Sequence, residues 1–369
     1  MSDKQKDPYA SIHYSNYLKL DQLLSAQELR SELVGKPAHD EMLFIIIHQV
    51  YELWFKQIQH ELDSITNMFK SDFVDEKNIG QAIDRLDRII TILHLQVQQI
   101  LVIETIKPHE FLDFRNYLFP ASGFQSFQFR KVEVSLGLST KNRITYNNKP
   151  YHIFFTDEQT NELNQIESNG SLLDEINKWL ERTPFLQFNT FNFLKDYHGA
   201  VDSMIAREQE NIRQNQFLSD EEKQMRLKML GDTTTYFNSI FDEGTHNQLV
   251  SEGKLRFSYK ATLAALFIKL YKEHPLLRLP NTLLERLLDI EELLTTWRFR
   301  HSQMVLRTLG KKIGTGGSSG HDYLFDTVIK HRIFTDLYNL ATMMIPKEDL
   351  PALPEDLQEK LDFYYSRNK

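Results

Sequence analysis

The chain has 369 residues, of which 41% are hydrophobic and 25% charged, so it can bury a sizeable core in one large domain or two ordinary ones. Its net charge of -8 argues against nonspecific affinity for nucleic acid. It has no cysteine. That excludes disulfides, cysteine-ligated zinc, iron–sulfur clusters and thiol nucleophiles, and it fits a reducing interior.

The N-terminal residues 1–7 lack the apolar segment of a signal peptide. The chain has no run of about 18 apolar residues, so we expect no membrane span. The expected location is the cytoplasm.

Apolar residues recur every three or four positions in four long segments, which predicts four long helices. These helices are expected at 40–69, 77–105, 279–310 and 322–345. Gly310 and Gly314 are expected to end the third, and Pro346 the fourth. The predicted fold class is therefore all-α.

Two segments between these helices are less regular. Residues 142–155 combine β-branched and aromatic side chains around Asn147 and Asn148, which suggests a short hairpin or an ordered loop. Residues 157–250 read as helical but polar. With no linker of the Gly/Ser or Pro-rich kind, we expect residues 1–369 to form a single helical domain, with 140–250 as a peripheral elaboration.

The segment 41–56 is apolar on every side, which predicts a buried helix, and it carries His48 directly after five large apolar residues. A titratable ring in such a place finds a partner, loses its charge or takes part in chemistry. Taken alone, a core histidine with satisfied hydrogen bonds is the more common case. Phe44 one turn earlier and Tyr51 and Glu52 about one turn later place aromatic rings on the same face.

His301 follows Trp297 by four residues and Leu294 by seven, so it lies on the apolar stripe of a long helix. A neutral imidazole on such a face is what a haem iron needs as its axial ligand. The alternative is a buried histidine bonded to a backbone carbonyl.

Arg115 lies among Phe111, Leu112, Phe114 and Leu118. An arginine in apolar surroundings rarely stays unpaired. One interpretation is an internal ion pair with an acidic residue. The other is a bidentate clamp for the carboxylate of a substrate.

The segment 314–320 has four glycines, which is more than a turn requires and permits a close approach of backbone to a ligand. It lacks the lysine of a phosphate-binding P-loop. It matches the nucleophile-elbow pattern around Ser318, but a helix rather than a strand is expected before it. Metal patterns are weak, because Glu243 and His246 form only one of the two Glu-x-x-His motifs of a di-iron bundle.

The order of these segments is more specific than any one of them. Residues 14–27, 39–56, 114–130 and 297–320 together closely resemble tryptophan 2,3-dioxygenases. The resemblance extends from residue 14 to about residue 324 and is weakest over 140–250. It implies a haem-dependent dioxygenase that cleaves the indole C2–C3 bond of L-tryptophan with O2. The product is N-formyl-L-kynurenine, in the first step of tryptophan catabolism through kynurenine.

The resemblance also implies a role for each matched position. His301 corresponds to the axial ligand of the iron of haem b, which is ferrous in the active state. His48 corresponds to the distal histidine that hydrogen-bonds the indole N–H, either orienting it or acting as a base. Arg115 corresponds to the residue that pairs with the substrate carboxylate, and Thr315 to the one that contacts the ammonium and carboxylate end. Phe44 and Phe111 correspond to the aromatic walls around the indole, and Ser122 and Gly123 to backbone near the haem. Tyr14, Tyr17 and Leu18 correspond to residues that reach into the pocket of a neighbouring subunit. The last three imply a homotetramer built as a dimer of dimers.

One position departs from the family pattern. An aromatic residue usually follows the glycine-rich loop, whereas this chain has His321, Asp322 and Tyr323 in that order. Two alternatives to the dioxygenase stay open. A haem-binding sensor or carrier would use His301 but leaves Arg115 and Thr315 unexplained, and a serine hydrolase would use Ser318 without haem.

Overall fold

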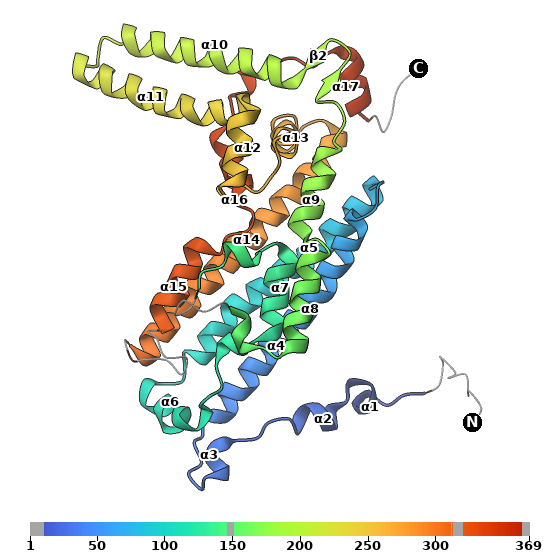
Figure 1. Cartoon of the computed structure of the whole chain (residues 1–369), viewed down its shortest axis with the longest axis vertical. Coiled ribbons are helices and arrows are strands. Elements are labelled where there is room, and N and C mark those ends of the chain that lie inside the picture. The colour runs from blue at the N-terminus through green and yellow to red at the C-terminus, as the bar shows by residue number, and fades with distance from the viewer. Residues whose placement is uncertain (1–10, 146–150, 311, 313–319, 364–369) are drawn as a thin grey trace.

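Three long helices run through the centre of the molecule in the computed structural model, which describes residues 11–145, 151–310, 312 and 320–363 (Figure 1). They are α4 (Glu41–Phe69), α5 (Glu76–Ile103) and α14 (Pro275–Leu309). Helix α5 packs along both α4 and α14. All three lie where the apolar spacing predicts them, and α14 ends before Gly310 as expected. The all-α fold class is confirmed.

Shorter helices surround this centre. Helix α7 packs along α4, α15 along α14, and α13 against α9. Helices α10 and α11 project from one end as an antiparallel pair (Figure 1). The bounds of the shorter helices are α1 Tyr14–Leu18, α2 Leu20–Leu24, α3 Arg30–Leu33, α6 Pro108–Arg115, α7 Phe127–Leu136, α8 Asp157–Ser168, α9 Leu172–Glu181, α10 Phe193–Gln214, α11 Asp220–Phe241, α12 Glu243–Ser251, α13 Tyr259–Leu270, α15 Gly320–Lys330, α16 Thr335–Thr342 and α17 Glu355–Leu361.

The main apolar core includes fully buried residues of α4, such as Leu62 and Ile65, together with Leu86 of α5 and Leu287 of α14. Ile176 of α9 and the first turn of α10 belong to the same core. Helix α5 also has the length and apolar composition of a membrane span, a property that core helices of soluble proteins share. The division of the chain into one domain with a peripheral part stays a prediction.

The hairpin expected at 142–155 is not formed by the described part of that segment. It contains short 3-10 turns at Thr140–Asn142 and Tyr151–Phe154, and residues 146–150 lie outside the described part of the chain. Among the described residues the β-structure is one antiparallel pair, β1 (Gln187–Phe188) with β2 (Phe191–Asn192). Contacts with distant parts of the chain explain the difference. The N–H of Ile144 donates to Nε2 of His331 at 3.1 Å, and Arg143 pairs with Glu133 at 2.6 Å.

The single helix expected at 322–345 is wrong, since α15 and α16 are separate. Side chains of α14 bind the backbone where the helix breaks. Glu291 accepts hydrogen bonds from the N–H groups of Ile333 and Phe334 at 2.6 and 3.0 Å, and Arg298 donates to the carbonyl of His331 at 3.1 Å. A buried carboxylate and a buried guanidinium thus replace the helical partners of these backbone groups.

The His331 ring is buried at this break, and its Nε2 accepts a hydrogen bond from the N–H of Ile144 at 3.1 Å. The neutral ring therefore carries its proton on Nδ1, which lies 3.8 Å from a carboxylate oxygen of Glu133. Burial lowers the pKa of His331, against the opposing effect of Glu133. A second proton on Nε2 would abolish the bond to Ile144.

We expect His331→Gln to reduce the pH dependence of the free energy of unfolding. The unfolded chain binds a proton at histidine near pH 6.5, whereas folded His331 does so only at lower pH. Stability is therefore lost as pH falls below about 6.5, down to the folded pKa. Glutamine keeps an acceptor for Ile144 and does not titrate. Urea unfolding of both proteins at steps between pH 7 and 5 measures the difference, and parallel curves would contradict the prediction.

Candidate active site

His48 lies in the second turn of α4, where its ring is tied to its own helix. Nδ1 is 2.6 Å from the carbonyl oxygen of Phe44, and the two rings are 4.2 Å apart. Because a carbonyl only accepts, Nδ1 carries the proton in the neutral ring and Nε2 is left as an acceptor. The His48 side chain is exposed. The apolar atoms around it lower the pKa of His48, so the ring is neutral at pH 7.

His301 lies near the end of α14, one turn after Trp297, whose ring is 5.2 Å away. Burial, and in second place the nearby His48, lower the pKa of His301 to about 4. Helices α4 and α14 meet here, since the Tyr51 ring, three residues after His48, lies 6.1 Å from the Trp297 ring. His48 and His301 therefore belong to the same part of the fold, although 253 positions separate them in the sequence. Among the described residues the His301 ring has no hydrogen-bond partner. It is thus a neutral imidazole with a free lone pair.

Aromatic rings form a wall beside His48. Phe111 and Phe114 of α6 lie 5.6 and 5.5 Å from Phe44 of α4, and 5.3 Å from each other. A small apolar cluster joins this wall of α4 and α6 to α5, to α14 and to the turn after α5. Its members are Ile47, Ile103 and Ile106, with Leu43, Phe44, Tyr51, Phe111 and Met304 packed on them. The cluster therefore joins α4, α5, α6 and α14 by apolar contacts beside His48.

Arg115 is the last residue of α6 and lies one turn after Phe111. Helix α6 begins at Pro108, where the side chain of Glu110 accepts a hydrogen bond from the N–H of Lys107 at 2.8 Å. That cap and the packing of Phe111 and Phe114 set the orientation of α6. Arg115 is half-buried and shares the Phe111 side of the helix.

Ser122 and Gly123 form a tight turn that precedes α7. The N–H of Ser122 donates to the side chain of Gln125 at 3.1 Å. Ser126 donates its hydroxyl to Glu52, at 2.5 Å, and so ties this turn to α4 one turn after His48. Burial raises the pKa of Glu52. A Cβ added at Gly123 would meet no atom within 4 Å, so there is open space beside this backbone.

The remaining expected residues are placed differently. Thr315 and Ser318 lie outside the described residues. Tyr14, Tyr17 and Leu18 lie on an N-terminal arm that runs away from the body, with 70%, 71% and 41% of their surfaces exposed (Figure 1).

The departure after the glycine-rich loop lies at the start of α15. His321 Nδ1 is 3.1 Å from a carboxylate oxygen of Asp322, and the Tyr323 ring packs 4.9 Å from Phe124.

Haem fits the residues of this site. A planar, largely apolar group needs a neutral imidazole, apolar walls and a backbone that leaves room, which His301, the Phe44 wall and Gly123 provide. The alternative metal motif does not fit, because His246 is buried with its Nε2 3.1 Å from the carbonyl of Phe257. In the part of the chain that the structure describes, no group of three or more His, Cys, Asp or Glu could hold a metal ion.

Some site residues were not predicted from the sequence. Met304 follows His301 by three residues on the same apolar stripe, which is a usable signal. The Ser126–Glu52 bond joins positions 74 residues apart and has no local signal. Another missed feature is the buried carboxylate of Glu133, although its spacing from Arg130 in an apolar segment is the spacing of a helical ion pair.

Comparisons with known proteins identify the family of the chain. The family model of tryptophan 2,3-dioxygenase matches residues 2–344. The chain is 48% identical to the tryptophan 2,3-dioxygenase of Bdellovibrio bacteriovorus, over 97% of this chain and 99% of that protein. It is 46% identical to that of Alteromonas mediterranea, over 95% and 97%, and 45% identical to that of Dictyostelium discoideum, over 96% and 89%.

Proposed function

The chain belongs to the tryptophan 2,3-dioxygenase family, and we infer that it opens the indole ring of L-tryptophan with O2. The C2–C3 bond is cleaved and both oxygen atoms enter the product, N-formyl-L-kynurenine. This is an oxidoreductase of the dioxygenase class and performs the first step of tryptophan catabolism. The observation that best supports this activity is the presence of two neutral imidazoles, His48 on α4 and His301 on α14, where these helices meet in one apolar cluster.

The cofactor we propose is haem b, with His301 as the axial ligand of the iron. When bound, the haem supplies the redox-active iron that allows O2 to react with indole. The protein contributes a neutral ligand on one side and an apolar wall of Phe44 and Phe111 that excludes water. The Ser122–Gly123 turn leaves room for the edge of the porphyrin.

His48 is proposed to orient the substrate. Because Nδ1 donates to the Phe44 carbonyl, Nε2 can accept a hydrogen bond from the indole N–H. The indole N–H is a very weak acid, so orientation is favoured over proton abstraction. Arg115 and Thr315 are proposed to bind the carboxylate and ammonium end, which fixes the ring at both ends.

We expect His48→Ala to slow turnover without abolishing it. The variant loses one neutral hydrogen bond, worth about 0.5–1.5 kcal/mol, or roughly a twofold to tenfold lower kcat/KM. The comparison substrate is 1-methyltryptophan, which has no indole N–H. With this substrate the ratio of kcat/KM between wild type and His48→Ala should be smaller than with L-tryptophan. Complete inactivity in a variant that holds haem and binds tryptophan would instead indicate that His48 is a base.

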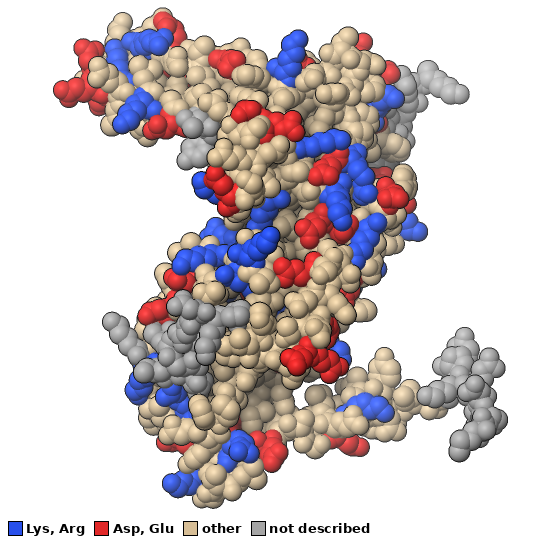
Figure 2. Space-filling view, in the orientation of Figure 1, with Lys and Arg blue, Asp and Glu red and all other residues tan. Residues whose placement is uncertain are grey.

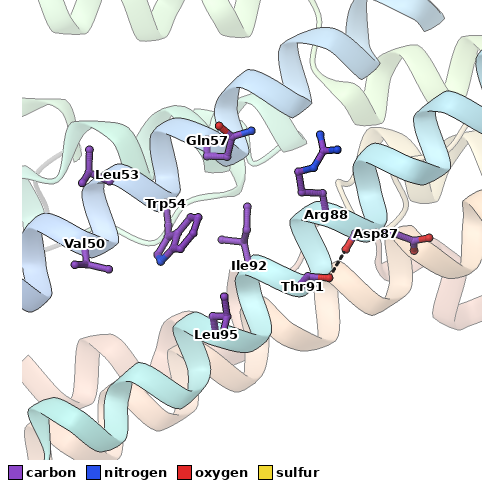
Figure 3. Close-up of a pocket in the computed structure, with 9 residues that line it drawn as sticks. All are labelled: Val50, Leu53, Trp54, Gln57, Asp87, Arg88, Thr91, Ile92 and Leu95. Carbon is purple, nitrogen blue, oxygen red and sulfur yellow. Dashed lines mark hydrogen bonds between the residues drawn. The ribbon is translucent and has the colours of Figure 1, made fainter. Parts of the chain in front are cut away.

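Two surfaces support an oligomer, which we propose is a tetramer. The arm of α1 and α2 buries no residue within its own chain. A groove of about 910 Å³ between α4 and α5 is mostly apolar, with Val50, Trp54 and Leu95 among its lining side chains (Figure 3). An apolar face of this kind is normally covered. Covering by further copies of the chain fits the dimer of dimers that the family resemblance implies.

The other proposed partners are small molecules. Lys and Arg are interspersed with Asp and Glu over the face seen in Figure 2, rather than gathered into one basic surface. This distribution and the negative net charge favour L-tryptophan and O2 over nucleic acid. We propose a cytoplasmic location without membrane attachment.

The activity is tested by mixing the ferrous, haem-loaded protein with L-tryptophan and O2. Steady growth of the near-ultraviolet absorbance of N-formylkynurenine is expected, and an oxygen-free sample should show none. A stable haem spectrum without product would identify a haem sensor or carrier. Ester hydrolysis by haem-free protein would point to Ser318.

A further inference from the structure

A buried charge network lies between α7, α14 and the break after α15. Its centre is Glu133 of α7, which pairs with Arg130 at 2.7 Å, Arg143 at 2.6 Å and Arg298 at 3.0 Å. The Glu133 side chain is 1% exposed and that of Arg298 3%. Glu133, these three arginines and His331 together form the Glu133 network.

The network depends on a single carboxylate. Burial by itself would raise the pKa of Glu133, but the guanidinium groups of Arg143, Arg130 and Arg298 outweigh burial and hold that pKa well below its usual range. Three guanidinium groups thus share one negative charge. Removing a partner from such a group leaves charge buried without compensation. Each member of the network therefore depends on the others for charge compensation.

Arg298 links this network to α14. Nη2 binds Glu133 of α7, and Nη1 donates to the carbonyl of His331 at 3.1 Å. The planar guanidinium of Arg298 therefore connects α14 both to α7 and to the backbone that follows α15. Trp297, the preceding residue, packs against Phe129 of α7 with ring centres 5.1 Å apart.

Arg298 and His301 are three residues apart on one helix, so their side chains are neighbours on its surface. A shift of α14 by one residue would turn His301 by about 100°. The His301 ring itself has no hydrogen-bond partner among the described residues. Its direction consequently depends on how the helix is held and on the packing of Trp297.

We propose that Arg298, held by Glu133, is a positioning residue for the haem ligand His301. The pair fixes the rotation and height of α14 one turn before the ligand. This inference rests on the proposed haem site and assigns to these two residues a role in cofactor binding that does not require contact with the cofactor.

The test compares Arg298→Met and Arg298→Lys with Arg286→Met. Arg286 lies on the same helix, about four turns before His301, and pairs with Asp87 and Asp289 outside the Glu133 network. Haemin is titrated into each apoprotein and followed by quenching of tryptophan fluorescence. The absorption and electron paramagnetic resonance spectra of the ferric forms report the axial ligand. Thermal unfolding of each apoprotein measures stability separately.

The Arg298→Met protein is expected to bind haemin about 10-fold more weakly. This is the low end of the range for groups bonded directly to a metal ligand, because Arg298 acts on His301 through the helix. Its spectra should show a mixed or altered axial ligand. Arg298→Lys keeps one of the two contacts and should recover part of the affinity, and Arg286→Met should bind as wild type does.

A purely structural role predicts another pattern. Arg298→Met would then unfold at lower temperature, while the folded protein keeps wild-type haemin affinity and spectra, and this result overturns the proposal. If Arg298→Met does not fold, Arg298→Lys and Glu133→Gln decide by the same measurements. A wild-type chain that binds no haemin would refute the proposed haem site itself, which is a different outcome.

Discussion

His301→Ala is expected to purify without stably bound haem. The proposed site offers one neutral imidazole on the α14 side, and alanine leaves the iron without its protein ligand there. The remaining apolar contacts do not replace a coordination bond. The expected measurement is loss of the Soret band after gel filtration of haemin-loaded protein. Activity should fall to background with it.

Two controls make the result specific to ligation. His109→Ala removes a histidine whose side chain is 76% exposed and should keep its haem. Imidazole added to His301→Gly should restore part of the Soret band, because the small ligand can enter the space of the deleted ring. A His301→Ala protein with a full haem content and a normal Soret band would show that another residue is the ligand.

Arg115→Leu is expected to lower kcat/KM for L-tryptophan by roughly 30-fold to several thousand-fold. Truncating one partner of a desolvated charge pair costs about 2–5 kcal/mol, because the other charge stays buried without a partner. Arg115 lies one turn after Phe111 of the aromatic wall, and we propose that it binds the carboxylate of the substrate from there. Steady-state kinetics of the haem-loaded variant give the ratio.

A substrate without the carboxylate isolates the clamp. Tryptamine keeps the indole and the ammonium group, so wild type should process it poorly and Arg115→Leu should not be much worse. Arg115→Lys should fall between wild type and Arg115→Leu for L-tryptophan, since lysine keeps the charge but not the bidentate geometry. An unchanged KM and kcat in Arg115→Leu would refute the clamp.

The spacing of apolar residues along the sequence predicted the three longest helices. Residues 40–69, 77–105 and 279–310 have long apolar stripes, and α4, α5 and α14 follow them closely. The break at residues 331–334 was missed because its cause lies elsewhere in the chain. Glu291 and Arg298 bind that backbone from α14, and no pattern within 322–345 reports their presence.

The candidate site was found through the order of four segments, and single residues were ambiguous. A satisfied core histidine and a ligand look alike in a helical stripe, so His48 and His301 could not be told apart locally. Their difference is in their bonds. The His48 ring is bonded to the Phe44 carbonyl, whereas the His301 ring has no partner among the described residues.

Composition and periodicity by themselves determined an all-α, cysteine-free chain with long helices, and the order of its motifs indicated its family. These properties depend on residue types and spacing along one helix. The helix at 41–56 was expected to be buried on every side, but Met42, Ile46 and Leu53 of α4 are exposed. Only the tertiary structure decided that α4 and α14 meet where they carry His48 and His301, that Glu133 binds three arginines, and where the segment 322–345 breaks into two helices. Each of these depends on contacts between segments far apart in the chain, and their burial and charge balance exist only after the helices have packed.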